Sequence, residues 1–329
     1  MATQYGFRPL PIFNFFRYVV KTTRFQNKEA ESRISLPVTG IYALVMCLLG
    51  GMFSGHMWVQ FGLLALASFL MMILNNANSL IRIYSRMVSC SFLVLSVMSF
   101  FLLSDIKCVA IEVCFISFYL FLFSAYQDKR AVGKVYYAFV MLGLASAMYV
   151  QILYLLPVLW IILYTNIMVG CGRTLLASVL GVLTPYWFIG AYYLYQNQTD
   201  WLVDHFCSIV DFQGIGLWAD VELVKICTIG FVVVLSFLGM IHFRLNNFKD
   251  KIRTRMRFEV FSVMSLVSMV MMAVHPQSMD YQLALLIVST SPMIGHYFAL
   301  THTFWTNISF YVILIVSLAL TAFNIWFPF

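Results

Sequence analysis

The chain has 329 residues, of which 62% are hydrophobic and only 10% are charged, and its formal net charge is +7. A chain of this length cannot bury so much apolar surface in one aqueous core, so a soluble globular protein is excluded and lipid is the expected solvent. Basic residues also set the orientation of membrane proteins, so the positive charge does not predict nucleic-acid binding.

Residues 1–34 combine basic and aromatic residues. Phe13 and Phe16 are one helical turn apart, with Arg17 beside them. This pattern is typical of an amphipathic helix in the cytoplasmic interface of a membrane. It lacks the apolar stretch and the small-residue cleavage site of a secretory signal. We therefore expect an interfacial segment over 1–34 and a single transmembrane domain over 35–329.

Apolar runs of about 17 to 23 residues then follow each other along the chain. At roughly 1.5 Å per residue, each is long enough to cross a hydrocarbon core of about 30 Å. Eleven crossings are predicted, near 38–55, 58–76, 87–104, 108–126, 135–151, 152–170, 175–196, 223–243, 257–274, 281–299 and 305–327. Little polar sequence separates 135–151 from 152–170, so this hairpin could instead dip into the membrane without crossing it. The expected fold class is an all-α, polytopic transmembrane helix bundle with 9 to 11 crossings.

Lys and Arg residues fix the orientation. With a cytoplasmic N-terminus, every Lys and Arg except Lys107 and Lys225 falls on the cytoplasmic side, as the positive-inside rule requires. The expected location is the bacterial inner membrane. Six cytoplasmic arginines are expected to anchor the protein at anionic lipid headgroups: Arg82, Arg86, Arg173, Arg253, Arg255 and Arg257.

Asn75, Asn78, Arg82 and Arg86 are spaced by three and four residues. A helix that continued through them would place all four on one face. Such a stripe would either meet lipid headgroups or hold a phosphate through its arginines.

Glu112 is the first candidate for a functional group inside the membrane, because ionisable residues are costly there. The alternative is that it lies near the outer interface, where it reaches water or pairs with Lys107. Pro185 interrupts another crossing and frees the carbonyl of Gly181, which Thr184, water or a neighbouring helix must satisfy. Such breaks line binding cavities in some proteins and are packing kinks in others.

The outer segment 197–220 carries four aspartates and no Lys or Arg, interleaved with aromatic residues, which predicts an acidic outer helix. Asp204 and His205 within it are candidates for acid/base chemistry. The histidines form no HxxxH or HExxH pattern, so no metal site and no cofactor are expected.

One block of features spans roughly residues 70–200. Its parts are Tyr-Gln-Asp-Lys-Arg at 126–130, Leu-Gly-Leu-Ala-Ser at 142–146, Leu-Pro at 156–157, Arg173, and Gly-Val-Leu-Thr-Pro at 181–185. In this order the block resembles an uncharacterised family of Bacteroidota inner-membrane proteins of unknown function. It also resembles the membrane core of GT-C glycosyltransferases, which move sugars from polyprenyl-phosphate donors on the outer face.

The second resemblance implies a catalytic acid in the first outer loop, but Ser-Gly-His-Met at 54–57 has no acid. Asp105 in the second outer loop is the nearest substitute, followed by Asp204. Lys107 would then stand near the donor phosphate, and the kinked helices would form the groove for the lipid-linked sugar.

The resemblance implies that this inner-membrane protein acts in cell-envelope biogenesis. Three functions remain open. The first is a GT-C-like lipid-linked-sugar transferase, whose partner would be a polyprenyl-phosphate lipid. The second is a noncatalytic scaffold or subunit whose acidic outer helix docks an envelope protein. The third is a transporter or lipid flippase that uses Glu112 and the proline breaks. The amino-acid sequence does not decide whether the protein is an enzyme.

Overall fold

The computed structural model describes residues 24–53, 55–197, 200–209 and 222–326. All regular elements within these ranges are helical. The α-helices are α2 (Phe25–Glu31), α3 (Ser35–Leu49), α4 (Trp58–Asn78), α5 (Met87–Met98), α6 (Phe101–Ser104), α7 (Ile106–Ser124), α8 (Val132–Met148), α9 (Leu156–Thr165), α10 (Gly172–Tyr195), α11 (Asp200–Cys207), α12 (Leu223–Asn246), α13 (Ile252–Val274), α14 (Met279–Leu300) and α15 (Phe304–Trp326). Short 3-10 helices lie at Val150–Leu155, Asn247–Lys249 and Pro276–Ser278.

Seven of these helices are long and apolar enough to cross a membrane, and α2 with α3, bent by 93° at their junction, form an eighth candidate. The all-α, multi-pass architecture is therefore confirmed. The predicted number of 9 to 11 crossings is not, because three of the predicted crossings correspond to shorter apolar helices: Met87–Met98, Val132–Met148 and Val150–Thr165.

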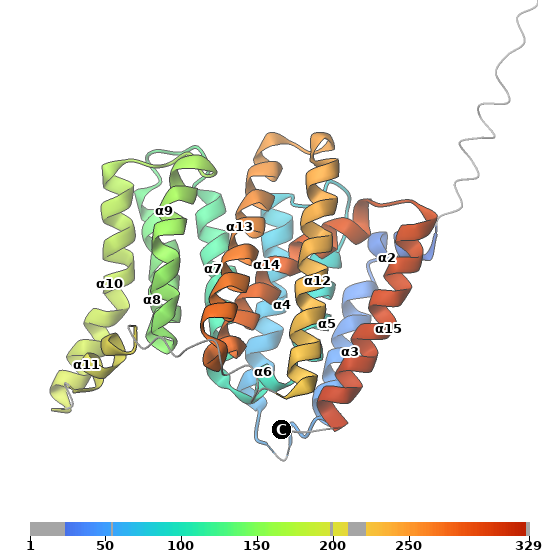
Figure 1. The fold of residues 1–329 in the computed structure, drawn as a ribbon. Helices are drawn as coiled ribbons and strands as arrows, with labels where there is room; N and C mark the ends of the chain where they lie inside the picture. Colours follow the sequence, from blue (N-terminus) through green and yellow to red (C-terminus); the bar gives the residue numbers. More distant parts are fainter. Residues whose placement is uncertain (1–23, 54, 198–199, 210–221, 327–329) are drawn as a thin grey trace, which may run out of the picture.

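The long helices run up and down the bundle, so most of the turns between them gather at its two ends (Figure 1). At one end, Arg82 Nη1 of the α4–α5 loop donates to the carbonyl of Lys249 in the α12–α13 turn at 3.2 Å. At the other end, the Tyr281 hydroxyl of α14 donates to Asp105 Oδ2, which precedes α7, at 2.9 Å. Each end thus joins segments that are distant in sequence.

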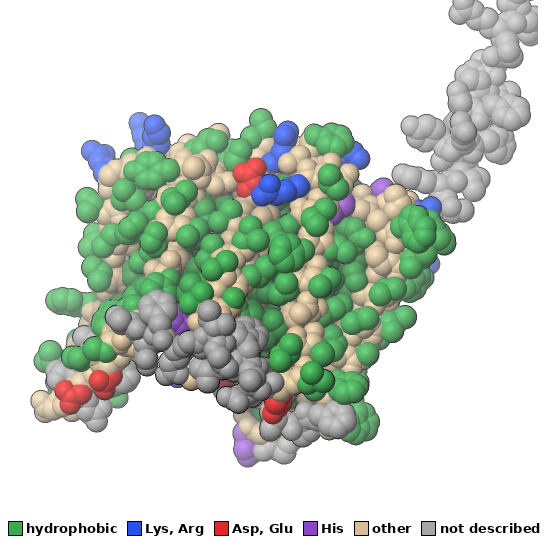
Figure 2. All heavy atoms as spheres, in the orientation of Figure 1, with side chains coloured by type: hydrophobic (Ala, Val, Ile, Leu, Met, Phe, Trp, Pro, Cys, Tyr) green, Lys and Arg blue, Asp and Glu red, His purple; other side chains and the backbone are tan. Residues whose placement is uncertain are grey.

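We call the first of these the basic end. Exposed cations gather there, including Arg82, Lys129, Arg130, Lys134, Arg173, Arg244, Lys249, Lys251 and Arg253. Figure 2 shows Lys and Arg along this edge and a mostly hydrophobic surface over the body of the bundle. This distribution agrees with a membrane protein whose basic end faces the cytoplasm.

Helix α14 is the centre of the bundle. Of its apolar window, 94% is buried inside the protein, and α5, α7, α12 and α13 pack around it. Gly295 permits the close approach of α5, because a Cβ there would lie 2.9 Å from the Val88 nitrogen. Protein, and not lipid, surrounds Ser289, Thr290 and His296 on this helix, which lowers the cost of placing polar groups at membrane depth.

Helices α8 and α10 pack closely through two glycines. A Cβ at Gly143 would lie 2.7 Å from the Val182 carbonyl oxygen, and a Cβ at Gly181 would lie 2.7 Å from the Tyr136 carbonyl oxygen. Small residues at a helix interface let two backbones approach each other within a membrane. The Gly-Leu-Ala-Ser and Gly-Val-Leu-Thr-Pro motifs therefore serve, at least in part, to pack these two helices.

Helix α2 is attached to the basic end by polar side chains. Gln26 Nε2 donates to the Phe298 carbonyl at 2.8 Å and to Thr301 Oγ1 at 2.7 Å, and Asn27 Nδ2 donates to the Thr301 carbonyl at 3.2 Å. These bonds hold the segment before α3 against the α14–α15 loop. Residues 1–23 of the predicted interfacial segment lie outside the described residues.

The predicted polar stripe after α4 does not form. Helix α4 ends at Asn78, and Ser79 takes a left-handed conformation with φ 48°, which turns the chain away from the helix axis. Asn75 instead stabilises the following loop, donating to the Ser85 carbonyl at 2.9 Å and accepting from the Ile81 nitrogen at 3.3 Å. Asparagine competes for backbone partners in this way at helix ends, so Arg82 leaves the helix face that its spacing predicted.

Candidate functional site

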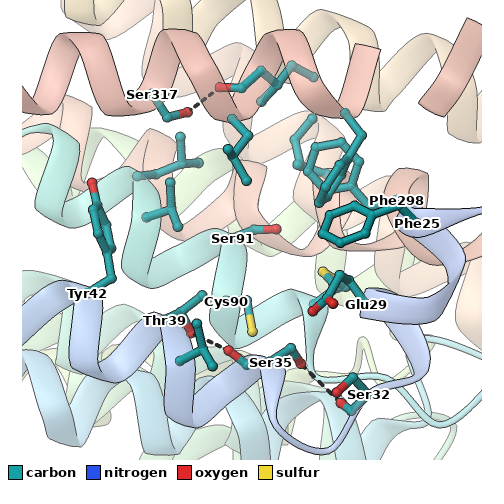
Figure 3. A pocket seen from close by; sticks show the side chains of 18 of the residues that line it. Phe25, Glu29, Ser32, Ser35, Thr39, Tyr42, Cys90, Ser91, Phe298 and Ser317 are labelled. Atoms are coloured by element: carbon teal, nitrogen blue, oxygen red, sulfur yellow. Dashed lines mark hydrogen bonds between the residues drawn. The ribbon is translucent and has the colours of Figure 1, made fainter. Parts of the chain in front are cut away.

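A large cavity lies between α2, α3, α5, α14 and α15 (Figure 3). Its volume is about 600 Å³, and its walls are predominantly apolar. We call it the apolar cavity. The lining includes Phe25, Val38, Leu95, Phe298 and Leu314. Mostly apolar concavities of roughly 300–1,000 Å³ are typical of small-molecule sites.

Polar groups lie at one end of the apolar cavity, where α2 meets α3. Lys28, Glu29 and Ser32 line this end, and Ser35 Oγ donates to the Ser32 carbonyl at 3.0 Å (Figure 3). One turn further along α3, Thr39 Oγ1 donates to the Ser35 carbonyl at 3.1 Å. Because both hydroxyls donate to backbone carbonyls, their oxygens can still accept a hydrogen bond from a ligand.

Further cations stand close to this polar end. The guanidinium groups of Arg33 and Arg86 lie 5.9 and 5.3 Å from the centre of the Tyr84 ring, and Arg86 Nε donates to the Tyr84 hydroxyl at 3.1 Å. Arg86 precedes Cys90, a lining residue, by one helical turn. Its Nη1 atom is buried and has no hydrogen-bond partner among the described residues. The cavity therefore combines apolar walls with a polar end that holds both Lys28 and Glu29, with two arginines nearby.

Nothing in the hydropathy pattern predicted the apolar cavity. Its walls come from both ends of the chain, and Phe25 on α2 is close to Phe310 and Tyr311 on α15, with ring centroids 6.2 and 5.5 Å apart. The one local signal is the spacing of Ser35 and Thr39, which places two hydroxyls on the same face of α3.

A polar cluster occupies the opposite end of α14, and Asp105 belongs to it. Asp105 caps α7 by accepting from the Lys107 nitrogen at 2.9 Å, and it accepts from the Tyr281 hydroxyl at the same distance. The Tyr281 ring stacks on Tyr149 at 4.8 Å, and Lys225 Nζ lies 3.8 Å from Asp280 Oδ2. We call these residues the opposite-end cluster.

Asp204 and His205 lie on α11, and they have partners other than those of Asp105. Asp204 is exposed, while the His205 ring lies 3.4 Å from the Tyr186 hydroxyl, which donates to Ser146 Oγ at 2.9 Å. Burial lowers the pKa of His205 below its ordinary value, and the positive charge of Lys107 acts in the same direction. Asp211 and Asp220 of the predicted acidic helix lie outside the described residues.

Glu112 is fully inside the bundle, with 2% of its surface exposed. Its Oε1 accepts a hydrogen bond from Ser96 Oγ at 3.4 Å, and its Oε2 has no partner among the described residues. The alternative that Glu112 reaches water at the outer interface is therefore wrong. Burial at membrane depth keeps it a candidate for a functional group.

Thr184 and Pro185 lie on the face of α10 that packs near α8. Thr184 Oγ1 donates to the Leu180 carbonyl at 2.7 Å and lies 3.0 Å from the Tyr136 hydroxyl. The Pro185 Cγ would lie 3.1 Å from a Cβ at Gly143. These contacts favour the packing interpretation of this break over a binding role.

The six predicted anchoring arginines fall into three groups by exposure. Arg82, Arg173 and Arg253 are exposed at the basic end, where headgroup contact is expected, and Arg86 and Arg255 are half-buried. Arg257 is only 2% exposed, and its guanidinium donates to the carbonyls of Asn78 and Phe123. The prediction for Arg257 is corrected: it joins the ends of α4 and α7 inside the protein.

No set of three His, Cys, Asp or Glu side chains in the described part of the chain is arranged to hold a metal ion. No family model, no curated protein and no solved structure matches the chain. The resemblances to the Bacteroidota family and to GT-C enzymes therefore stay predictions.

Proposed function

We propose that this multi-pass membrane protein handles a lipid in cell-envelope biogenesis, and that the apolar cavity binds the hydrocarbon chain of that lipid. The observation that carries the proposal is the combination of a cavity of about 600 Å³ with apolar walls and a polar end lined by Lys28, Glu29, Ser32 and Ser35. An amphiphile with a polar head matches this arrangement, because its chain and its head would each meet complementary surface.

The position of the cavity supports a lipid over a soluble ligand. Val38, Ile34 and Leu314 line it and are themselves 56%, 67% and 43% exposed on the lipid-facing surface. A lipid chain could therefore enter sideways from the bilayer without crossing water. The polar end lies at the basic end of the bundle, at the depth where lipid headgroups are expected.

Photocrosslinking tests the proposal directly. The purified protein is reconstituted in nanodiscs with a phosphatidylglycerol analogue that carries a diazirine in its acyl chain, and the labelled peptides are mapped. Val94 lines the cavity on α5 and is half-buried, so Val94→Trp is expected to fill the cavity and abolish labelling of α3 and α5. Val179→Trp, on the exposed surface of α10, is the matched control and should retain it. Equal labelling of both variants would refute the proposal.

A transferase reaction at the opposite-end cluster is the second candidate. It is supported by the Asp105 carboxylate, which the Tyr281 hydroxyl orients, and by the nearby cation Lys107. In such an enzyme Asp105 would act as the base that activates the acceptor hydroxyl. A lipid cavity at the basic end is compatible with this function but does not require it.

The glycan and lipid-linked-sugar profile of cells that lack the protein separates these functions. Asp105→Asn is the informative variant, because asparagine caps a helix as well as aspartate but cannot act as a base. Asp204→Asn tests the second candidate acid in the same way. Accumulated donor lipid with either variant would support the transferase. A normal profile with both variants, together with loss of function for Val94→Trp, would leave a lipid carrier. A normal profile with all three variants would favour a noncatalytic scaffold.

A further inference from the structure

A second cavity, the basic pocket, lies between the α4–α5 loop and the α12–α13 turn. Its volume is about 510 Å³, and it shares no lining residue with the apolar cavity. Its polar lining comes from two parts of the chain and includes Asn76, Ser79, Arg82, Lys249, Lys251 and Thr254. The pocket therefore exists only because the α4–α5 loop and the α12–α13 turn meet.

Three cations surround the basic pocket. Arg82 is held in place because its Nη1 donates to the Lys249 carbonyl at 3.2 Å. Lys249 and Lys251 flank the turn and are exposed, and Lys249 Nζ lies 5.2 Å from the centroid of the Phe248 ring. Lys251 precedes α13, a helix of 23 residues whose N-terminus adds positive potential on the same side.

The single acidic residue of the lining, Asp250, pairs with Arg82 and with a histidine inside the bundle. Asp250 has only 3% of its side chain exposed. Its Oδ2 lies 3.0 Å from His296 Nε2, inside the bundle, and its Oδ1 lies 3.9 Å from Arg82 Nη1. The carboxylate is thus engaged by His296 and Arg82, and the two lysines carry the remaining positive charge of the lining.

The geometry points to the basic pocket as a binding site for a phosphate group. Lys249 and Lys251 supply the net charge, and Arg82, which is paired with Asp250, supplies a guanidinium donor. The hydroxyls of Ser79 and Thr254 and the Asn76 amide supply neutral donors. Arginine and lysine around a concave surface are the groups that recognise phosphate in proteins. Orientation in the membrane accounts for basic residues at this end, but not for their convergence on one cavity.

Two sources could provide the phosphate. Leu245, Phe248 and Ile252 surround the turn and are 70%, 66% and 62% exposed, so the pocket lies beside a surface suited to lipid. An anionic headgroup could therefore reach it from the bilayer, and a soluble phosphate could reach it from water. Both sources present the same chemistry to the three cations.

The experiment compares wild type with two double variants of equal charge. Lys249→Gln with Lys251→Gln removes two cations of the basic pocket. Lys129→Gln with Arg130→Gln removes two exposed cations from the α7–α8 loop. Thermal unfolding in an uncharged detergent, without ligand, verifies that all three proteins fold. Phosphate binding is then measured from the rise in Tm with inorganic phosphate, against chloride at the same ionic strength. Lipid binding is measured by native mass spectrometry with phosphatidylglycerol and with phosphatidylcholine.

Wild type and the α7–α8 variant are expected to bind phosphate or phosphatidylglycerol saturably, and the pocket variant at least tenfold more weakly. Saturation by inorganic phosphate, which competes with phosphatidylglycerol, would assign a soluble source. Binding of phosphatidylglycerol alone, in preference to phosphatidylcholine, would assign a headgroup. Equal binding by the two double variants, or no saturable binding by wild type, would overturn the proposal. Val94, the residue changed in the photocrosslinking experiment, does not line the basic pocket. The phosphate-binding result and the crosslinking result can therefore fail independently of each other.

Discussion

The imidazole Nε2 of His296 lies 3.0 Å from Oδ2 of Asp250, and this contact joins the buried centre of the bundle to its basic end. His296 is 1% exposed and Asp250 is 8% exposed. The two residues hold the α12–α13 turn against α14, and so they set the position of Lys249 and Lys251 around the basic pocket.

His296→Ala is expected to lower the free energy of unfolding by about 3–5 kcal/mol, because it leaves the Asp250 carboxylate buried without its main partner. Thermal or denaturant unfolding in detergent measures this loss. Asp250→Asn should also destabilise the protein, and the double variant should lose less than the sum of the two single variants. Additive losses would mean that the contact contributes little to stability.

Gly181→Ala is expected to destabilise the α8–α10 pair by about 1–3 kcal/mol, as overpacking does. The new Cβ would meet the Tyr136 carbonyl oxygen at 2.7 Å, and a backbone atom cannot move away easily. Gly190→Ala is the control on the same helix, because a Cβ there meets nothing within 4 Å. It should leave stability unchanged or raise it by up to about 1 kcal/mol. Similar effects of both variants in an unfolding experiment would rule out the close-packing account.

Arg257→Met keeps much of the side-chain volume but removes the hydrogen bonds to the carbonyls of Asn78 and Phe123. Bonds to a charged group contribute about 1.5–3 kcal/mol each, so a clear fall in Tm is expected. Arg173→Met removes the same charge from an exposed position and should change Tm little. If the two variants unfolded at the same temperature, Arg257 would have no structural role beyond its charge.

We expect the docking of α11 against α10 to depend on pH through His205. Its pKa is lowered from the ordinary 6.5 because burial disfavours the charged ring. The unfolded or undocked state therefore binds a proton more readily, so docking is stable above about pH 6.5 and weakens as the pH falls through that value toward the lowered pKa. The protection factors of the amides in 200–209, which correct for the intrinsic pH dependence of hydrogen exchange, should fall at low pH. His205→Gln should remove most of this dependence, and an unchanged pH profile in that variant would assign it to another group.

Much of the fold followed from local sequence. Helix α12 was expected over 223–243 and spans Leu223–Asn246, and α14 was expected over 281–299 and spans Met279–Leu300. The agreement has a simple cause, because a long apolar segment in lipid must satisfy its backbone hydrogen bonds internally and so becomes a helix. Where the apolar run is short or broken, as at Val150–Leu155, length alone does not define a crossing.

Side-chain positions were harder to predict. The sequence placed Arg82 and Arg86 on the face of a continued helix, but the left-handed Ser79 ends that helix first. Hydropathy marked Glu112 as unusual, yet its depth depends on how α5 and α7 pack around it. Of the predicted catalytic residues, Asp105 lies in a polar cluster only because Tyr281 approaches it from 176 residues away.

The sequence by itself determined that this is an all-helical membrane protein with one basic end, because hydropathy and charge act locally on each segment. Only the tertiary structure decided which helix faces are buried against protein and which face lipid. That choice creates the apolar cavity between α2, α3, α5, α14 and α15. It also brings Arg82 beside Lys249, 167 residues further along the chain. Such contacts depend on the packing of whole helices, which no local pattern of residues specifies.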